Sequence, residues 1–318
     1  MKTKIGVVGK GDIAKQFVSQ LDRSKYEVVS VYNHSEASLK QFVQDYSLKN
    51  STTDYQAFLA NKEVEIVYIA TPNSTHYDYV LKALEHGKHV LCEKVMVLTS
   101  KESAHLFQVA KENKVVLLEA VTLFYMPMFQ AVREKIANGE IGKVSGASVL
   151  FGSCKDYDPN NRFFSKEKGG GALFDIGTYA LSAAVYFLGT SLSLLGTDVE
   201  FAPTGVDEKS VSIFKNESGQ QASVMISFRG KMPKQILITG DKGFVQINDF
   251  PRAETATMYM NSGEVVEVTS GNSVEVFNYE LDMLNDYLQG APKENDLRDI
   301  TQQVISLMDD MGKAWNNN

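Results

Sequence analysis

The sequence is poor in cysteine and has no excess of positive charge, and each shortage excludes a class of protein. Only two cysteines, Cys92 and Cys154, occur in 318 residues, and their spacing matches no metal site. So few cysteines fit a reducing compartment better than a disulfide framework. The 32 Lys and Arg against 39 Asp and Glu give a formal net charge of −7, which argues against a nucleic-acid-binding protein.

The sequence also lacks a long hydrophobic run. No apolar stretch approaches the roughly 18 residues of a membrane span. After Met1 to Lys4 the chain enters a strand-like run at once, with no hydrophobic signal segment. We therefore expect a cytoplasmic protein without membrane contact, and 318 residues are enough for two domains that each bury a core.

Short, continuously apolar runs separated by amphipathic helical patterns fill residues 1–120. Buried strands that alternate with helices indicate an α/β domain with a parallel, doubly wound sheet of the Rossmann type. The predicted strands are Ile5–Val8, Val28–Tyr32, Ile66–Ala70, Val90–Cys92 and Val115–Leu118, and the predicted helices are Asp12–Leu21 and Tyr77–His86.

Residues 121–318 follow a different pattern and form the second expected domain. A helical pattern from Ala172 to Leu188 precedes a series of runs that alternate at period two, and another helical stretch begins at Tyr279. The alternation predicts an α+β domain with an antiparallel sheet buried on one face. If the other face is shared with a second subunit, the protein is a homodimer or a dimer of dimers. The alternating runs are Val211–Phe214, Gln221–Phe228, Gln235–Thr239, Phe244–Ile247, Thr257–Met260 and Val265–Val268.

A glycine-rich turn follows the first predicted strand. Residues 9–14 read Gly-Lys-Gly-Asp-Ile-Ala, a G-x-G-x-x-A fingerprint between a strand and a helix. Gly9 permits the tight turn, and Gly11 lets backbone amides approach a pyrophosphate. Asp12 and Ile13 open the helix whose N-terminus favours negative charge, and Ala14 lets that helix pack closely on the strand. The turn predicts binding of a nicotinamide dinucleotide, with a plain strand-to-helix turn as the alternative.

The end of the second strand bears on the choice between NAD and NADP. In NAD-binding domains an acidic side chain about 20 residues past the fingerprint binds the ribose 2′-hydroxyl. Here Asn33, His34 and Ser35 stand there, and Glu36 comes only afterwards. No carboxylate would repel a 2′-phosphate, and these three side chains could donate to one, so the sequence favours NADP. The alternative is that they only turn the chain and that NAD is accepted as well.

The loop after the strand at Ile66–Ala70 borders the expected ligand crevice, which lies at the carboxyl ends of the strands. Thr71, Pro72 and Asn73 are predicted to lie beneath the cofactor. His76 is a further candidate for cofactor binding, although the stronger expectation is that its side chain caps or packs near the next helix.

Two further segments are candidates for the chemistry. Glu93-Lys94 follows another apolar strand, so the Lys94 ammonium could hydrogen-bond a reacting oxygen while Glu93 lies near the cofactor. The glycines at 169–171 open the helix that carries Asp175 and Tyr179, which are neighbours on one helical face. A surface Glu-Lys pair and a solvated helical stripe are the alternatives, but three glycines at a helix start are costly unless something must come close.

The position of the histidines narrows the choice of a general acid or base. All five lie in the first half of the chain, so a histidine of the second domain is excluded. Tyr179, Lys94 and Asp175 are left. A phenol, with a pKa of about 10, becomes competent when a nearby ammonium stabilises the phenolate, and we pair Tyr179 with Lys94 on that ground.

Together these segments resemble the glucose–fructose oxidoreductase/inositol dehydrogenase family (Gfo/Idh/MocA) over essentially the whole chain. That family joins a Rossmann domain to an open, mostly antiparallel sheet domain that often mediates dimerisation. The resemblance implies that Lys94 matches the lysine of the family's Glu-Lys-Pro motif and Asp175 its substrate-binding aspartate. Tyr179 stands where many members have histidine. A tyrosine at this position resembles the branch that contains glucose–fructose oxidoreductase, dihydrodiol dehydrogenase and NADP-linked xylose dehydrogenase.

The resemblance implies an NAD(P)-dependent dehydrogenase or reductase that acts on a sugar, a polyol or a dihydrodiol-like substrate, without a metal. Two positions depart from the pattern. Val95 replaces the proline that fixes the backbone of the lysine, so Lys94 is expected to be less rigidly held. Asn33 to Ser35 stand where NADP-linked relatives usually show Ser-Arg. The alternatives are a non-catalytic dinucleotide-binding sensor on the same fold, and an isomerase or hydrolase that holds NAD tightly.

Overall fold

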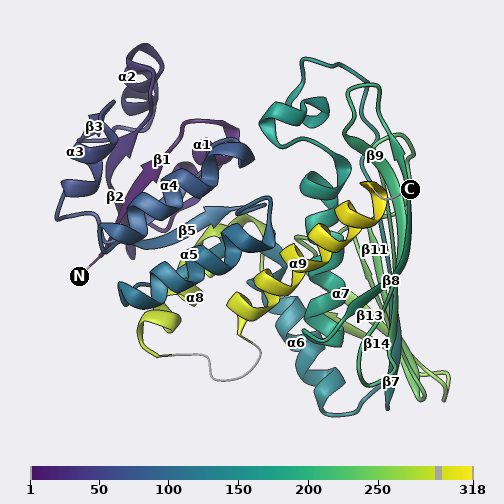
Figure 1. Ribbon diagram of the computed structural model, residues 1–318. Coiled ribbons are helices and arrows are strands. Elements are labelled where there is room, and N and C mark those ends of the chain that lie inside the picture. Colours follow the sequence, from purple (N-terminus) through teal and green to yellow (C-terminus); the bar gives the residue numbers. More distant parts are fainter. Residues whose placement is uncertain (1, 291–295, 317–318) are drawn as a thin grey trace. The chain divides into compact units, whose positions relative to one another are not determined.

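The computed structural model describes residues 2–290 and 296–316. The elements gather into two compact units, whose ribbons are shown in Figure 1. One division of the chain falls after Ala120, at the predicted boundary, whereas the return of the chain to the first unit at Phe277 was not predicted. The first unit holds the described parts of Met1–Val97, Lys101–Ala120 and Phe277–Pro292, and the second holds Leu98–Ser100, Val121–Val276 and the described part of Lys293–Asn318.

The first unit is built on a six-stranded parallel sheet with the order β3-β2-β1-β4-β5-β6, which confirms the predicted Rossmann architecture. Its central strands are apolar on both faces, because helices cover both. The elements are β1 (Thr3–Val8), α1 (Asp12–Gln20), β2 (Tyr26–Tyr32), α2 (Glu36–Asp45), β3 (Ser51–Thr52), α3 (Tyr55–Ala60), β4 (Ile66–Ile69), α4 (Asn73–Glu85), β5 (His89–Glu93), α5 (Ser100–Glu112), β6 (Leu117–Ala120) and α8 (Val276–Leu288).

Several elements of this unit differ from the prediction. Helices α2, α3 and α5 and strand β3 were not predicted. Helix α4 begins at Asn73 and not at Tyr77; Pro72 is its N-cap residue, and its first turn is polar. Apolar periodicity therefore gives no signal for that turn. Strand β6 spans Leu117–Ala120, two residues later than the apolar run at Val115–Leu118.

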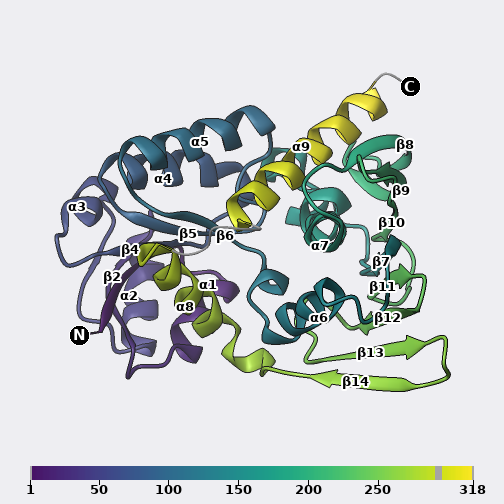
Figure 2. The same ribbon diagram turned by 90° about the horizontal axis from the view of Figure 1, so that it is seen from below.

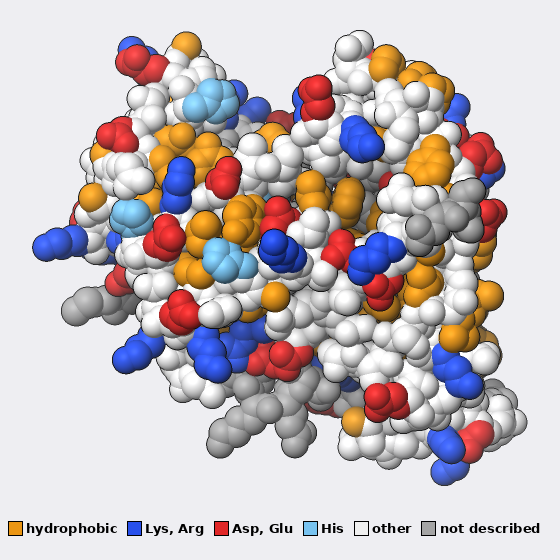
Figure 3. All heavy atoms as spheres, in the orientation of Figure 1, with side chains coloured by type: hydrophobic (Ala, Val, Ile, Leu, Met, Phe, Trp, Pro, Cys, Tyr) orange, Lys and Arg blue, Asp and Glu red, His pale blue; other side chains and the backbone are white. Residues whose placement is uncertain are grey.

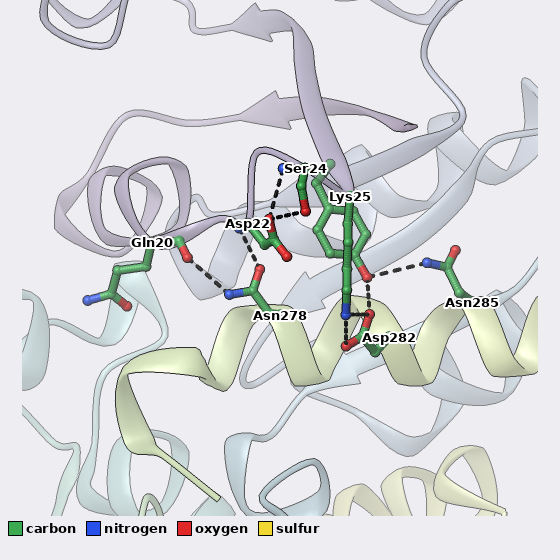
Figure 4. A network of polar contacts seen from close by, with 8 residues as sticks. Gln20, Asp22, Ser24, Lys25, Asn278, Asp282 and Asn285 are labelled. Atoms are coloured by element: carbon green, nitrogen blue, oxygen red, sulfur yellow. Dashed lines mark hydrogen bonds and ion pairs between the residues drawn. The ribbon is translucent and has the colours of Figure 1, made fainter. Parts of the chain in front are cut away.

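Helix α8 belongs to the first unit, although it follows the strands of the second unit in sequence. Figure 4 shows the polar contacts that hold it against the segment between α1 and β2. The Asn278 side chain accepts a hydrogen bond of 2.8 Å from the Asp22 backbone N–H. The Asp282 carboxylate accepts from the Tyr26 phenol at 2.5 Å and from the Lys25 ammonium at 3.0 Å. These side chains fix a helix that the chain order alone would not assign here.

The second unit is built on an eight-stranded sheet with the order β14-β13-β12-β11-β7-β10-β9-β8. Neighbouring strands are antiparallel except β7 and β10, which confirms a mostly antiparallel sheet. Strands β7 and β8 were not predicted. The elements are η1 (Thr122–Phe124), α6 (Pro127–Ala137), β7 (Val144–Gly152), η2 (Arg162–Phe164), η3 (Lys166–Lys168), the π-helical turn η4 (Leu173–Gly177), α7 (Thr178–Leu188), β8 (Ser193–Phe201), β9 (Asp207–Lys215), β10 (Gln221–Ser227), β11 (Gln235–Gly240), β12 (Gly243–Asn248), β13 (Thr255–Met260), β14 (Val265–Thr269), η5 (Ser273–Glu275) and α9 (Leu297–Asn316).

One face of this sheet packs against α7, and α9 packs on α7 and on β8 (Figure 2). Along β9 the residues alternate between buried and exposed, as expected for a sheet with one covered face. Residues 166–188 are long and apolar enough to cross a membrane by length and composition, which the sequence pattern did not predict. Most of that stretch is buried inside the unit, as is typical of a core helix.

Charged side chains of both signs are interspersed over the face of the molecule shown in Figure 3. No large patch of Lys and Arg gathers on that face. Such a mixture of charges is expected for a chain with 32 Lys and Arg and 39 Asp and Glu.

Candidate functional site

The phosphate turn of the first unit lies between β1 and α1. Gly9 has φ of +106°, and a Cβ added there would lie 2.3 Å from the Ala70 carbonyl oxygen. Glycine is therefore required for this turn to pass the end of β4. A Cβ added at Gly11 would meet no atom within 4 Å, so the space beside this residue is open.

The N-terminus of α1 offers its backbone N–H groups to a ligand. Gly11 is the N-cap residue and supplies no side-chain hydrogen bond to the first turn. Ala14 is fully buried, which lets the helix approach the sheet closely. Asp12 and Ile13 form the first turn, and the exposed Asp12 carboxylate pairs with Lys15 at 3.3 Å. Open space beside an uncapped helix N-terminus fits the pyrophosphate of a dinucleotide.

The end of β2 holds the residues that bear on the ribose. Asn33 is buried and donates from its side chain to the Ser35 carbonyl at 3.3 Å. The Ser35 hydroxyl lies 2.7 Å from that of Ser38, and His34 is exposed. The carboxylate that follows them, Glu36, pairs with Lys40 at 3.1 Å on the surface of α2. The three side chains are polar and two of them are accessible, which fits a 2′-phosphate or a 2′-hydroxyl.

His76 links the loops that follow β4 and β5. It is fully buried on α4, and its Nδ1 lies 2.9 Å from the Val95 carbonyl oxygen and its Nε2 2.8 Å from that of Thr71. Burial lowers the pKa of His76, and the positive charge of Lys94 lowers it further. The contacts with the two carbonyl oxygens act in the opposite direction but do not outweigh burial. A neutral imidazole has one N–H and donates to one carbonyl at a time. His76 therefore packs inside the unit and contacts the backbone of both loops.

The loop that carries Lys94 is held more firmly than its sequence suggests. Val95 is fully buried and its carbonyl meets His76, and the Lys94–Val95 peptide bond is cis. The Met96 backbone N–H donates to the buried Glu119 carboxylate at 2.7 Å. Two buried side chains thus hold the backbone on the C-terminal side of Lys94, where the sequence predicted a less rigid placement.

Glu93 supports this loop from the sheet. Its carboxylate accepts a hydrogen bond of 2.5 Å from the Tyr68 phenol of β4. Burial raises the pKa of the Tyr68 phenol, and the charges of Glu93 and Glu280 raise it further. The phenol therefore stays protonated and acts as a donor to Glu93.

In the second unit, a buried carboxylate caps the helix that carries the candidate residues. Asp207, at the start of β9, accepts a hydrogen bond of 2.7 Å from the Leu173 backbone N–H. Gly171 has φ of +120°, and a Cβ there would lie 2.3 Å from the Asp207 carboxylate. Burial raises the pKa of Asp207 to about 7, and the hydrogen bond from Leu173 acts in the opposite direction. The glycine run is thus explained in part by this close approach.

Asp175 lies on the π-helical turn between two cations. Its carboxylate is 3.6 Å from the Lys155 ammonium and 3.7 Å from the Arg162 guanidinium. Opposite charges at this distance favour the ionised carboxylate, which accepts hydrogen bonds. Tyr179 is half-buried one turn later, and its ring centre is 6.1 Å from that of Phe151.

The predicted dinucleotide residues all lie in the first unit, and Asp175 and Tyr179 lie four residues apart in the second. The pairing of Lys94 with Tyr179 stays a prediction. Sequence reasoning missed Lys155, Arg162 and Asp207, which lie far from Asp175 along the chain or in irregular loops. For Asp207, the available sequence signal was its place with Glu208 at the start of an otherwise alternating strand.

Replacing His76 tests its role as a support for both loops. We expect His76→Ala to lower the free energy of unfolding by about 2 kcal/mol, because a buried carbonyl loses its hydrogen-bond donor and the packing of the imidazole is lost. Urea unfolding measures this loss. The control is His105→Ala, since His105 is a surface partner of the Tyr77 hydroxyl. Equal stability of the two variants would contradict the role given to His76.

The pKa of Asp207 makes a prediction about pH. A carboxyl whose folded-state pKa is about 7 keeps its proton over a range where the unfolded chain, with a pKa of about 3.9, has lost it. The free energy of unfolding should therefore fall as the pH rises from about 4 to about 7. Asp207→Asn should remove this slope while its amide oxygen still accepts from Leu173. Thermal unfolding across this pH range measures the slope, and the exposed Asp156→Asn is the control; unchanged slopes in Asp207→Asn would show the idea to be wrong.

Comparison with known families agrees with this geometry. Residues 3–121 match the model of the Gfo/Idh/MocA oxidoreductase family, NAD-binding Rossmann fold, and residues 129–246 match the Gfo/Idh/MocA C-terminal domain. Together the two models cover most of the chain.

Individual relatives point the same way. Trans-1,2-dihydrobenzene-1,2-diol dehydrogenase of Xenopus tropicalis is 30% identical over 78% of this chain and 76% of the relative. D-xylose 1-dehydrogenase (NADP(+)) 2 of Haloferax volcanii is 28% identical over 83% of this chain and 82% of the relative. The fold of the 3-ketoreductase KijD10 from Actinomadura kijaniata, solved with NADP and TDP-benzene, matches with a TM-score of 0.86 at 22% identity, over 99% and 98% of the two chains. The chain therefore belongs to the Gfo/Idh/MocA family of oxidoreductases, with the family's NAD-binding Rossmann fold and its C-terminal domain.

Proposed function

We propose that this protein transfers a hydride between NADP, with NAD as the second choice, and a carbon that carries a hydroxyl or carbonyl group in a sugar, polyol or dihydrodiol-like substrate. The observation that carries the proposal is the open, uncapped N-terminus of α1 beside Gly11, within a chain of this family. The named relatives are dehydrogenases and a reductase, which favours an enzyme over a sensor. When bound, the nicotinamide ring supplies the hydride chemistry.

The residues of the first unit have two roles in this proposal. Backbone N–H groups at the start of α1 hold the pyrophosphate, and Asn33, His34 and Ser35 contact the ribose and its 2′-phosphate. Lys94 donates a hydrogen bond to the reacting oxygen and stabilises the charge that develops on it. Its backbone is already fixed by His76 and Glu119, so little ordering is needed when substrate binds.

The residues of the second unit orient the substrate and move the proton. The ionised Asp175 accepts hydrogen bonds from substrate hydroxyl groups. The Tyr179 phenol donates a proton to the reacting oxygen during reduction and accepts it during oxidation. Lys94 is the other candidate for that proton, because an ammonium can also give one up.

Removing the phenol separates these two candidates. We expect Tyr179→Phe to lower kcat by about 10²- to 10⁴-fold while cofactor affinity stays unchanged, if the phenol carries the proton. NADPH absorbance follows turnover on a panel of aldoses, polyols and dihydrodiols, and fluorescence titration gives the affinity. Tyr157→Phe is the matched control, because Tyr157 is an exposed tyrosine of the same unit. Full turnover in Tyr179→Phe would assign the proton to Lys94, and cofactor binding without turnover of any compound by the wild type would favour the sensor.

We further propose that the protein forms a homodimer, or a dimer of dimers, through the outer face of the eight-stranded sheet. On the face opposite α7, the side chains of Val211, Ile213 and Met225 are 43% to 50% exposed. Met225 lies directly across from Val211 in the pairing of β9 with β10, so the three form one apolar patch. A flat sheet face suits a two-fold interface, because the same patch meets itself.

A charge in this patch tests the dimer. We expect Ile213→Lys to convert the dimer to a monomer, since each interface would bury two like charges. Light scattering coupled to size exclusion measures the mass. Glu217→Gln, in the exposed turn between β9 and β10, makes the same change in net charge and should leave the mass unchanged. A wild-type monomer, or a dimer that tolerates Ile213→Lys, counts against this interface.

A further inference from the structure

Asp175, the residue proposed to orient the substrate, lies on a turn that its own sequence does not cap. In this π-helical turn, η4, the Thr178 backbone N–H donates to the Leu173 carbonyl five residues earlier. Such turns are rare and are found often at functional sites. The helical hydrogen bonds begin at the Gly171 carbonyl, which accepts from the Asp175 N–H at 3.2 Å. Neither Gly171 nor Ala172 has a polar side chain that accepts from the first N–H groups.

A side chain from a distant strand takes the place of the missing cap. The Asp207 carboxylate, 34 residues later in the chain, accepts from the buried Leu173 N–H at 2.7 Å. Asp207 is only 6% exposed. Burial raises its pKa to about 7, so both the ionised and the neutral form are present at neutral pH. Each form has an oxygen that accepts a hydrogen bond, so Leu173 keeps its acceptor in both.

The two glycines before the turn fit closely around this contact. A Cβ at Gly171 would lie 2.3 Å from the Asp207 carboxylate, and a Cβ at Gly170 would lie 2.5 Å from the Arg162 carbonyl oxygen. The Gly171 N–H donates to the Phe163 carbonyl at 2.9 Å. The glycines therefore contact both Asp207 and the loop that carries Arg162, the cation 3.7 Å from Asp175.

The turn and the helix after it have different supports. Leu173 is bonded at both ends, through its N–H to Asp207 and through its carbonyl to Thr178, and Asp175 lies two residues beyond it. A buried N–H is costly to leave without an acceptor, so loss of Asp207 should rearrange the start of the turn. Helix α7, which carries Tyr179, packs in addition against β7, β10 and α9. Tyr179 is therefore less dependent on Asp207 than Asp175 is.

We propose that Asp207 is a positioning residue, which holds the Leu173 backbone N–H and thereby fixes the turn that presents the Asp175 carboxylate to the substrate. The inference rests on the proposed function, because it concerns substrate binding at the same site. Asp207 acts through the backbone and does not itself contact the substrate. Its loss should therefore weaken substrate binding more than it slows the chemical step.

Two substitutions of Asp207 test this by steady-state kinetics at saturating NADP. The substrate is the compound of the aldose, polyol and dihydrodiol panel that the wild type turns over fastest. We expect Asp207→Ala to raise KM for this compound on the order of tenfold while kcat changes much less, because the acceptor of a buried N–H is lost. Asp207→Asn keeps an acceptor oxygen and should restore the wild-type KM. If Asp207→Ala does not fold, Asp207→Ser replaces it, because the serine hydroxyl is too short to reach Leu173.

A control separates misplacement of Asp175 from a general loss of stability. Phe214→Leu changes a buried side chain near the other end of β9, where Phe214 pairs with Leu194 and Ala222. Urea unfolding measures the stability of each variant, and Phe214→Leu should keep the wild-type KM. A wild-type KM in Asp207→Ala, a KM that Asp207→Asn does not restore, or an equal rise in Phe214→Leu would overturn the inference and leave the proposed function standing.

Amide hydrogen exchange tests the contact without turnover. The peptide that covers residues 173–178 should exchange faster in Asp207→Ala than in the wild type, Asp207→Asn or Phe214→Leu. If the wild type turns over no compound of the panel, the proposed function fails and exchange alone decides. Faster exchange confined to Asp207→Ala then supports Asp207 as the support of the Asp175 turn, and unchanged exchange overturns the inference.

Discussion

The site in the first unit depends on one buried side chain, the His76 imidazole between two backbone carbonyls. It comes from α4 and meets the loop after β4 on one side and the loop after β5 on the other. Parallel strands bring these two loops to the same edge of the sheet, but the sheet does not fix their separation. Because the imidazole is fully buried, its removal leaves a carbonyl oxygen without the donor that the fold supplies. The contact therefore ties the backbone that follows Lys94 to the backbone of Thr71.

This support also explains how valine can stand after Lys94. In the resembling motif a proline restricts the backbone at that point through its ring. Here hydrogen bonds from His76 and to Glu119 restrict it from outside the loop. Tertiary contacts thus restrict the backbone where the motif uses a local covalent constraint. A departure from the motif at one position thus says little about the rigidity of the site until its neighbours are known.

The sequence predicted the fold well where the signal is local. The apolar runs of β1, β4 and β5 and the alternation along β9 to β14 follow directly from which faces are buried. The glycine fingerprint likewise follows from the φ of Gly9 and its approach to Ala70. What could not be predicted depends on contacts distant in sequence. The return of α8 to the first unit rests on Asn278 and Asp282, whose partners lie more than 250 residues earlier.

The candidate site of the second unit likewise combines residues with a local sequence signal and residues without one. Asp175 and Tyr179 were found from their spacing on one helix, but the cations that face Asp175 have no sequence pattern of their own. Lys155 and Arg162 stand in irregular loops, and only folding shows that both reach the same carboxylate. The place of Asp175 on its helix is therefore readable from the sequence, whereas the cations beside its carboxylate follow from the tertiary fold.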